Sequence, residues 1–249
     1  MACGGETIDN YGFIRRFPAA SMLTGLLANA LGWRRIEGER HQSLQDRLVF
    51  AVRIDREPAG GVSLVDFQTA QLDKSDKGWT TRGRPEGRAG GGNTYNAPHL
   101  RFREYFADMR FTIALRIEPV EGRPTVDDLA NALEQPARPL FIGRKPCLPS
   151  APMFDCFSEG ESALAALLAA PLDEREAPDT VRLLWPENDS PKVMAEVKRS
   201  RTHMLTDQRN WCSSGLHGGG RLVCEGTVAR DRLPAHNAAM PQTEKDEQQ

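Results

Sequence analysis

The chain has 249 residues, 39% hydrophobic and 27% charged, which is the balance of a globular protein rather than of a disordered one. Its 32 lysines and arginines almost cancel its 34 aspartates and glutamates, so a polyanionic partner must bind a local basic surface. No apolar run reaches the roughly 20 residues of a membrane span, and the first thirty residues do not resemble a signal peptide. The chain is therefore expected in the cytoplasm with no membrane partner.

The predicted elements begin after a glycine-rich, irregular stretch over residues 1–17. Apolar residues at three- and four-residue spacing then predict a helix over Ser21–Leu31. Residues rich in β-branched and aromatic types predict strands at Leu48–Ile54 and Val62–Phe67, and the turn between them predicts that these strands form a hairpin. A long polar stretch follows over residues 70–99.

Beyond the polar stretch, alternating residues predict a strand over Arg110–Glu118. Thr125 is a predicted helix cap, with acidic residues in the first turn of a helix that runs through Gln135. The apolar run Leu140–Ile142 predicts a short strand. Further on we expect a helix that is capped by Ser158 or Ser162 and ends at Ala169, and strands at Thr180–Trp185, Val193–Val197 and Arg221–Val228.

This order of helices and strands predicts an α+β domain with an antiparallel sheet over residues 1–145. It matches most of the β-α-β-β-α-β order of the ferredoxin-like (RRM-like) fold, but a clear strand before the first helix is missing. Residues 146–230 are expected to form a small C-terminal extension with strands. Residues 231–249 are polar and poor in aromatic side chains, which predicts a disordered tail.

The strongest chemical signal is a basic, glycine-rich stretch at residues 74–103. Seven lysines and arginines against two acidic residues give it a charge of +5 (7 − 2) in a chain of net charge −2. Arginines neutralise phosphates, and aromatic rings stack on bases for about 1–3 kcal/mol each, so the stretch predicts single-stranded RNA binding. The predicted contacts in it are Trp79, Arg82, Arg84, Arg88, Tyr95, Asn96, His99, Arg101 and Arg103. A solvated surface loop is the alternative interpretation.

Two smaller basic spots are further candidates for RNA contact. Arg144 and Lys145 follow Gly143 after a predicted strand, and Arg16 lies in the pair Arg15-Arg16 before the first helix. Ordinary surface charge is the alternative interpretation of both spots.

Catalytic and metal-binding patterns are weak in this sequence. The five cysteines are odd in number and have no C-x-x-C spacing, the histidines are scattered, and no metal or other cofactor is predicted. The HGGG at residues 217–220 resembles a lipase oxyanion loop, but the G-x-S-x-G nucleophile motif is missing. A metal-free ribonuclease needs a general base, a general acid and a cation; His99, Tyr95 or Tyr105, and Arg101 are the side chains available for those roles.

Four segments in the same order resemble the CasD-type subunit of Cascade, the type I-E CRISPR effector. These segments are RFPAASMLTGLLANALGW (Arg16–Trp33), LVFAVRID (Leu48–Asp55), NAPHLRFREYFAD (Asn96–Asp108) followed by FTIALRI, and FIGRKPCLPSAP (Phe141–Pro152). The resemblance extends over roughly residues 1–230.

The resemblance implies a ferredoxin-like domain of the repeat-associated RNA-binding superfamily, in which residues 70–99 form a thumb, an extended hairpin that helps to kink the guide strand. It implies a non-catalytic subunit that holds the 5′ handle of the CRISPR RNA beside a backbone subunit and the large subunit, and that meets target DNA only indirectly. Relatives in another subtype cut precursor RNA, so a metal-independent endoribonuclease that processes CRISPR repeat RNA is the alternative.

The resemblance also divides the candidate RNA-binding residues into two groups. Arg101, Arg103, Arg144 and Lys145 lie in segments that match the family, whereas the thumb arginines lie where family members differ most. Family members begin with a hydrophobic strand and a glycine-proline turn just before the segment that matches MACGG. We therefore expect that the start at Met1 is too late or that the chain is truncated.

Overall fold

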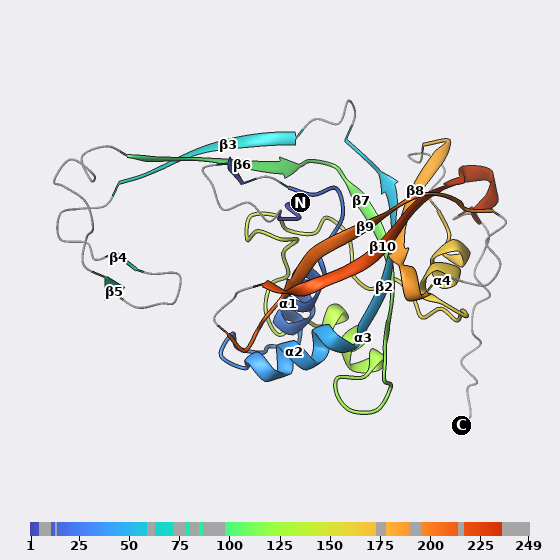
Figure 1. Cartoon of the computed structure of the whole chain (residues 1–249), viewed down its shortest axis with the longest axis horizontal. Helices are drawn as coiled ribbons and strands as arrows, with labels where there is room; N and C mark the ends of the chain where they lie inside the picture. Colours follow the sequence, from blue (N-terminus) through green and yellow to red (C-terminus); the bar gives the residue numbers. More distant parts are fainter. Residues whose placement is uncertain are drawn as a thin grey trace, which may run out of the picture.

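The computed structural model describes residues 1–4, 11–12, 14–58, 63–71, 78–79, 85–86, 98–172, 178–189, 196–213 and 217–235. Its helices are α1 (Ala20–Ala30), α2 (Gly38–Arg47), α3 (Val126–Glu134) and α4 (Ala163–Ala169), with 3₁₀ turns η3 (Glu187–Asp189) and η4 (Arg230–Arg232). Its strands are β1 (Tyr11–Gly12), β2 (Leu48–Arg56), β3 (Ser63–Ala70), β4 (Gly78–Trp79), β5 (Pro85–Glu86), β6 (His99–Phe106), β7 (Arg110–Ile117), β8 (Thr180–Pro186), β9 (Lys198–Arg209) and β10 (His217–Ala229) (Figure 1). No described helix is long and apolar enough to cross a membrane.

A five-stranded antiparallel sheet forms the body of the molecule, in the order β7-β2-β8-β10-β9. With the helices that pack on it, this sheet confirms the predicted α+β class. The strands that follow residue 145 (β8, β9 and β10) complete the same sheet as β2 and β7 (Figure 1). The division into domains at residue 145 stays a prediction.

Strand β2 is central because it buries apolar side chains on both faces of the sheet. Phe50, Val52 and Ile54 join a core cluster with Leu23 of α1, whereas Ala51 faces the cluster built on α4. The prediction that β2 and β3 form a hairpin is wrong, because β2 pairs with β7 and β8 while β3 pairs with β6. A strand buried on both faces needs neighbours within the body.

Three apolar clusters hold the helices to the sheet. On one face, α4 lies over β2 and β7, and its Leu164 and Leu167 are fully buried in a cluster with side chains of β8 and β10. On the other face, α1 packs over β2, and its C-terminal half packs with α2 and α3 through Leu27, Leu44 and Leu129. These clusters make the body a layered structure, and the arm described below projects from it.

The two helix caps that the sequence predicts are present. The Thr125 hydroxyl accepts a hydrogen bond from the Asp128 N–H, and the Asp128 carboxylate accepts one from the Thr125 N–H, which forms a capping box at α3. Of the two serines proposed for α4, Ser162 is the cap, since its hydroxyl accepts from the Ala165 N–H at 3.0 Å. These caps are local features, so the sequence alone reveals them.

One predicted strand is absent, a second lies mostly outside the described residues, and one helix is not predicted by the sequence. Leu140–Ile142 is not a strand, because its backbone groups bond to an irregular turn and to Ala2. Of the strand predicted at Val193–Val197, residues 193–195 lie outside the described residues, Glu196 and Val197 are not in a strand, and β9 starts at Lys198. The sequence does not predict helix α2, because Leu44 is the apolar residue on its buried side, and the other buried residues are Gly38, His41, Gln45 and Arg47.

An arm projects from one side of the body (Figure 1). It consists of the antiparallel pair β3 and β6, with the two-residue β1 parallel to β6 at its base, and the short pair β4 and β5 lies beyond it. Strands β3 and β6 thus flank the residues predicted to form the thumb. Most of that thumb lies outside the described residues.

The two chain ends of the described structure contact the body. Met1 and Phe106 exchange backbone hydrogen bonds of 2.6 and 2.9 Å, so the N-terminus lies where the arm meets the body. Near the other end, the Leu172 N–H donates to the Pro234 carbonyl at 2.8 Å, and Leu233 is buried. The rest of the predicted tail, residues 236–249, lies outside the described residues.

Candidate nucleic-acid interface

The register of the arm gives it two chemically different faces. Residues directly opposite each other in an antiparallel pair project to the same side. One side carries Arg101, Arg103 and Tyr105, opposite Gln68, Asp66 and Leu64, and we call it the basic face. The other side carries Leu100, Phe102 and Glu104, opposite Thr69, Phe67 and Val65, and we call it the apolar face.

The basic face concentrates positive charge near the base of the arm. Arg101 and Arg103 are two residues apart on β6, so both side chains project to the same side, and a third guanidinium, that of Arg144, lies 5.0 Å from the centre of the Tyr105 ring. Asp66 is the acidic residue opposite Arg103. Arginine forks bind phosphate in a bidentate manner, so this face is suited to a nucleic-acid backbone.

The apolar face leaves large hydrophobic side chains in solvent. Phe67, Val65 and Leu100 are 58%, 55% and 43% exposed. The Phe67 and Phe102 rings lie 5.3 Å apart in a tilted arrangement. A contiguous apolar patch on an isolated hairpin marks a surface that contacts something else.

Arg144 fixes the base of the arm. Its guanidinium donates to the Glu104 carbonyl and to the Gly12 carbonyl, each at 3.1 Å, which ties β6 to β1. The Arg144 side chain packs closely on Gly12, since a Cβ atom at position 12 would lie 2.6 Å from Arg144 Nη2 and would displace it. Gly143 has φ +84°, and a Cβ atom there would lie 1.8 Å from the Ala2 carbonyl oxygen. Two donor groups of Arg144 are therefore used inside the protein, and RNA contact by this residue stays a prediction.

The other sequence candidates have different surroundings. Lys145 is exposed beside Arg144 and makes no ion pair with the described part of the chain. Arg16 pairs with Glu57 at 3.3 Å, and Glu57 also pairs with Arg182 at 2.5 Å. Arg16 is thus part of an ion-pair network of the body rather than of the arm.

Several predicted contacts lie outside what the structure describes. For Trp79 and His99 the structure describes only the backbone, in β4 and β6. The remaining candidates of the thumb, Arg82, Arg84, Arg88, Tyr95 and Asn96, lie outside the described residues. Their roles in RNA binding stay predictions.

Sequence reasoning missed a charged cluster around Glu225, whose side chain is 9% exposed. Its carboxylate pairs with Arg182 at 2.9 Å and with Arg201 at 2.7 Å, and its Oε2 lies 2.6 Å from His203 Nε2. Burial raises the pKa of Glu225, but the hydrogen bonds from Arg201, His203 and Arg182 outweigh burial and lower the pKa to about 2. The cluster joins β8, β9 and β10, and no spacing in the sequence signals it.

The structure describes the side chains of only some of the residues that the ribonuclease alternative would use. Tyr105 lies under the Arg144 guanidinium on the same face as Arg101, whereas the His99 side chain and Tyr95 are outside the described residues. Among the residues that the structure describes, no group of three or more metal-ligating side chains comes together.

The fold defines the class of this protein first. The chain superimposes on a chain of a structure titled "CRISPR RNA-guided surveillance complex" with a TM-score of 0.61 and 23% identity, over 94% of this chain and 90% of that one. It also matches a structure titled "Crystal structure of Cas protein" with a TM-score of 0.54 and 24% identity, over 92% of this chain and 89% of the other. At these identities the likeness is one of fold, an α+β body shared with CRISPR-associated proteins.

The sequence narrows this class to one family. The model of the family described as CRISPR-associated protein (Cas_Cas5) matches residues 4–223, and the chain belongs to that family. The "CRISPR system Cascade subunit CasD" of Escherichia coli (strain K12) is 29% identical over 154 residues, which are 62% of this chain. The match spans 65% of that relative, just under two thirds of its length.

Proposed function

We propose that this chain is a non-catalytic, RNA-binding subunit of a CRISPR surveillance complex and that it binds the 5′ handle of the CRISPR RNA through the basic face of its arm. Family membership and the fold shared with a chain of a surveillance complex support the proposal that the chain is a subunit of such a complex. The placement of Arg101 and Arg103, both half-buried, together on the basic face of β6 is the observation that carries the RNA contact. In this proposal the body is a ferredoxin-like domain and the arm is the base of its thumb.

The apolar face has a separate role in this proposal. Nucleic acid takes the basic face, so Val65, Phe67 and Leu100 contact a neighbouring protein subunit, the backbone subunit or the large subunit. Burial of such side chains contributes roughly 1.5–3 kcal/mol each, which would stabilise the assembly. Target DNA is reached only through the assembled complex.

The experiment that tests RNA binding compares two double variants of the full chain. Arg101→Ala/Arg103→Ala removes two guanidinium groups from the basic face, and Lys198→Ala/Arg232→Ala removes two exposed charges from the body as a control. Because hydrogen bonds to charged groups contribute about 1.5–3 kcal/mol each, we expect the first variant to weaken binding of handle-containing CRISPR RNA at least about tenfold. The control should bind like the original chain.

Equal affinities of the two double variants would contradict the proposal. Melting temperatures of both variants show whether either one has lost its fold. The alternative, a processing endoribonuclease, is tested by incubating the purified chain with repeat RNA in the presence of EDTA. A cleavage product under those conditions would overturn the non-catalytic assignment.

A further inference from the structure

A second group of positive side chains lies at the end of β9, away from the basic face of the arm. It consists of Arg209, the last residue of β9, and of Arg34 and Arg35, both exposed in the turn that leads into α2. The start of α2 packs beside this end of β9, since Gly38 lies against the Trp211 carbonyl. Among the described residues, none of the three guanidinium groups has a carboxylate within ion-pair distance. Partial burial and then the nearby charge of Arg35 lower the pKa of Arg209.

The neighbouring acidic residues do not neutralise this group. Glu37 is the nearest in sequence, and its carboxylate already accepts the Arg34 N–H at 2.5 Å and pairs with Arg40 at 2.5 Å. Glu39 is exposed on the first turn of α2. Two like charges held close together repel each other, and a bound anion would relieve that repulsion.

Helix α2 holds Arg209 in a fixed position. Gln45, 3% exposed, donates to the Arg209 carbonyl at 2.9 Å and accepts from the Arg209 N–H at 3.1 Å. Its Oε1 also accepts from Trp211 Nε1 at 3.0 Å, and the Arg209 guanidinium lies 5.1 Å from the Trp211 ring centre. Gly38 allows the backbone of Trp211 to pack against α2, because a Cβ atom at position 38 would lie 2.5 Å from the Trp211 carbonyl oxygen.

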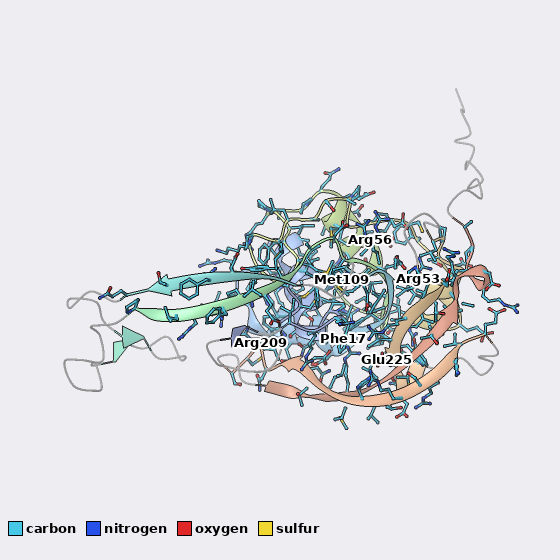
Figure 2. All side chains as sticks on the ribbon, turned by 90° about the horizontal axis from the view of Figure 1, so that it is seen from above. Phe17, Arg53, Arg56, Met109, Arg209 and Glu225 are labelled. Atoms are coloured by element: carbon cyan, nitrogen blue, oxygen red, sulfur yellow. The ribbon has the colours of Figure 1, made fainter. Side chains whose placement is uncertain are left out.

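The cluster lies on the same side of the molecule as the arm. In Figure 2, Arg209 is labelled at the end of the body from which the arm projects, and Figure 1 shows the β9 end on that same side. A strand of nucleic acid that extends from the arm across this side of the body would reach the end of β9.

We propose that Arg34, Arg35 and Arg209 form a second phosphate-binding site, which takes the backbone of the same single-stranded RNA that contacts the arm. This inference rests on the proposed RNA-binding function and extends it to a surface of the body. A guanidinium fork matches the geometry of a phosphodiester, and arginine is more weakly hydrated than lysine, so pairing with phosphate loses less hydration. The preformed position of Arg209 lowers the entropy cost of binding.

The test is the salt dependence of RNA binding by the full chain. A labelled single-stranded RNA long enough to span arm and body is titrated at several KCl concentrations, and log Kd is plotted against log salt concentration. Each phosphate contact with a single strand contributes about 0.7 to the slope. We expect Arg35→Ala/Arg209→Ala to reduce the slope by about 1.4, whereas Lys198→Ala/Arg232→Ala leaves it unchanged.

Lys198 is a matched control because it lies at the opposite end of β9, about 35 Å from Arg209 at strand spacing. Arg35→Ala alone touches no internal contact of the fold and should reduce the slope by about 0.7 with no change in melting temperature. An unchanged slope in both cluster variants, with a reduced slope in Arg101→Ala/Arg103→Ala, overturns this inference and leaves the proposed function standing. Absence of RNA binding by the original chain overturns both, and impaired complex assembly with unchanged RNA binding assigns the cluster to a protein partner instead.

Discussion

Arg53 shows how one side chain joins an irregular segment to the sheet. It is fully buried on β2, where its Nε pairs with Asp55 at 2.5 Å. Its other nitrogens donate to the carbonyls of Leu167 at 3.0 Å, Ala170 at 2.6 Å and Pro171 at 2.8 Å, which end helix α4. Carbonyls at a helix C-terminus have no partner within the helix. Arg53 supplies donors to the carbonyls of Ala170 and Pro171, and it adds a second donor to the Leu167 carbonyl, which also accepts from the Ala170 N–H at 3.3 Å.

Replacing Arg53 by methionine should therefore destabilise the fold strongly. The change leaves Asp55 buried without its cation and removes the Arg53 donors from the carbonyls of Ala170 and Pro171. Loss of one partner of a buried pair costs about 3–5 kcal/mol. Urea unfolding measures the difference. Arg123→Ala breaks an exposed pair with Asp128 instead and should cost less than about 1 kcal/mol; equal losses for the two variants would refute this role of Arg53.

Glu225 makes stability depend on acid pH. Its pKa is about 2 in the folded chain, against an ordinary value of 4.5, so the unfolded chain binds a proton more readily between these values. The contribution of Glu225 is complete above pH 4.5 and is lost as pH falls toward 2. We expect Glu225→Gln to be less stable than the original chain at pH 7, with the gap closing between pH 4.5 and 2. A constant gap across that window, in thermal unfolding at a series of pH values, would rule out this titration.

At the scale of elements, the arm has two opposite faces that suit two kinds of contact. The alternation of HLRFREYF in β6 puts arginines on one side and Leu100 and Phe102 on the other. Because neighbouring residues of β6 project to opposite faces, a single hairpin can contact RNA with one face and protein with the other.

Phe67→Ser should separate the two roles of the arm. It removes an exposed ring from the apolar face, so we expect less of the chain to co-purify with its neighbouring subunits while the isolated chain keeps its RNA affinity within about twofold. Gln68→Ser, the adjacent residue on the basic face, is the control and should assemble normally. If Phe67→Ser assembles as well as Gln68→Ser, the apolar face is not a subunit contact.

Helices and strands with a cap or an apolar pattern in their own sequence could be predicted. Those that depend on hydrogen bonds to residues far away in the chain could not. The cap of α3 at Thr125 and the strand β7 depend on neighbours in the chain. Helix α2 and strand β9 are mostly polar, and they hold together through bonds such as Gln45 to Arg209, 164 residues apart. Their sequences have no apolar periodicity, so periodicity does not reveal them.

The candidate site follows the same division. The two faces of β6 could be predicted from alternation alone, but the structural role of Arg144 could not, since its acceptor at Gly12 lies 132 residues away. The group of Arg34, Arg35 and Arg209 likewise combines residues from two distant segments, the α1–α2 turn and the end of β9. The charge of a short stretch of sequence does not show that residues distant in the chain lie close together in the fold.

At the scale of the whole molecule, the sheet carries the arm and the β9 end on one side, and the α4 layer packs on one face of the same sheet (Figure 1). Positive groups on the basic face and at the end of β9 compensate for the net charge of −2 of the chain by concentrating positive charge where an RNA strand would lie. Two basic groups thus lie on one side of the molecule, whereas the ion pair of Arg53 and Asp55 lies in its interior.

The most direct test of the central claim is photo-crosslinking of the assembled complex that carries CRISPR RNA, with 4-thiouridine placed in the 5′ handle. Digestion and mass spectrometry then identify the peptides attached to RNA. The account predicts crosslinks from the handle to the β6 peptide that contains Arg101 and Arg103. Handle crosslinks only to other subunits, with the arm attached to protein alone, would contradict it.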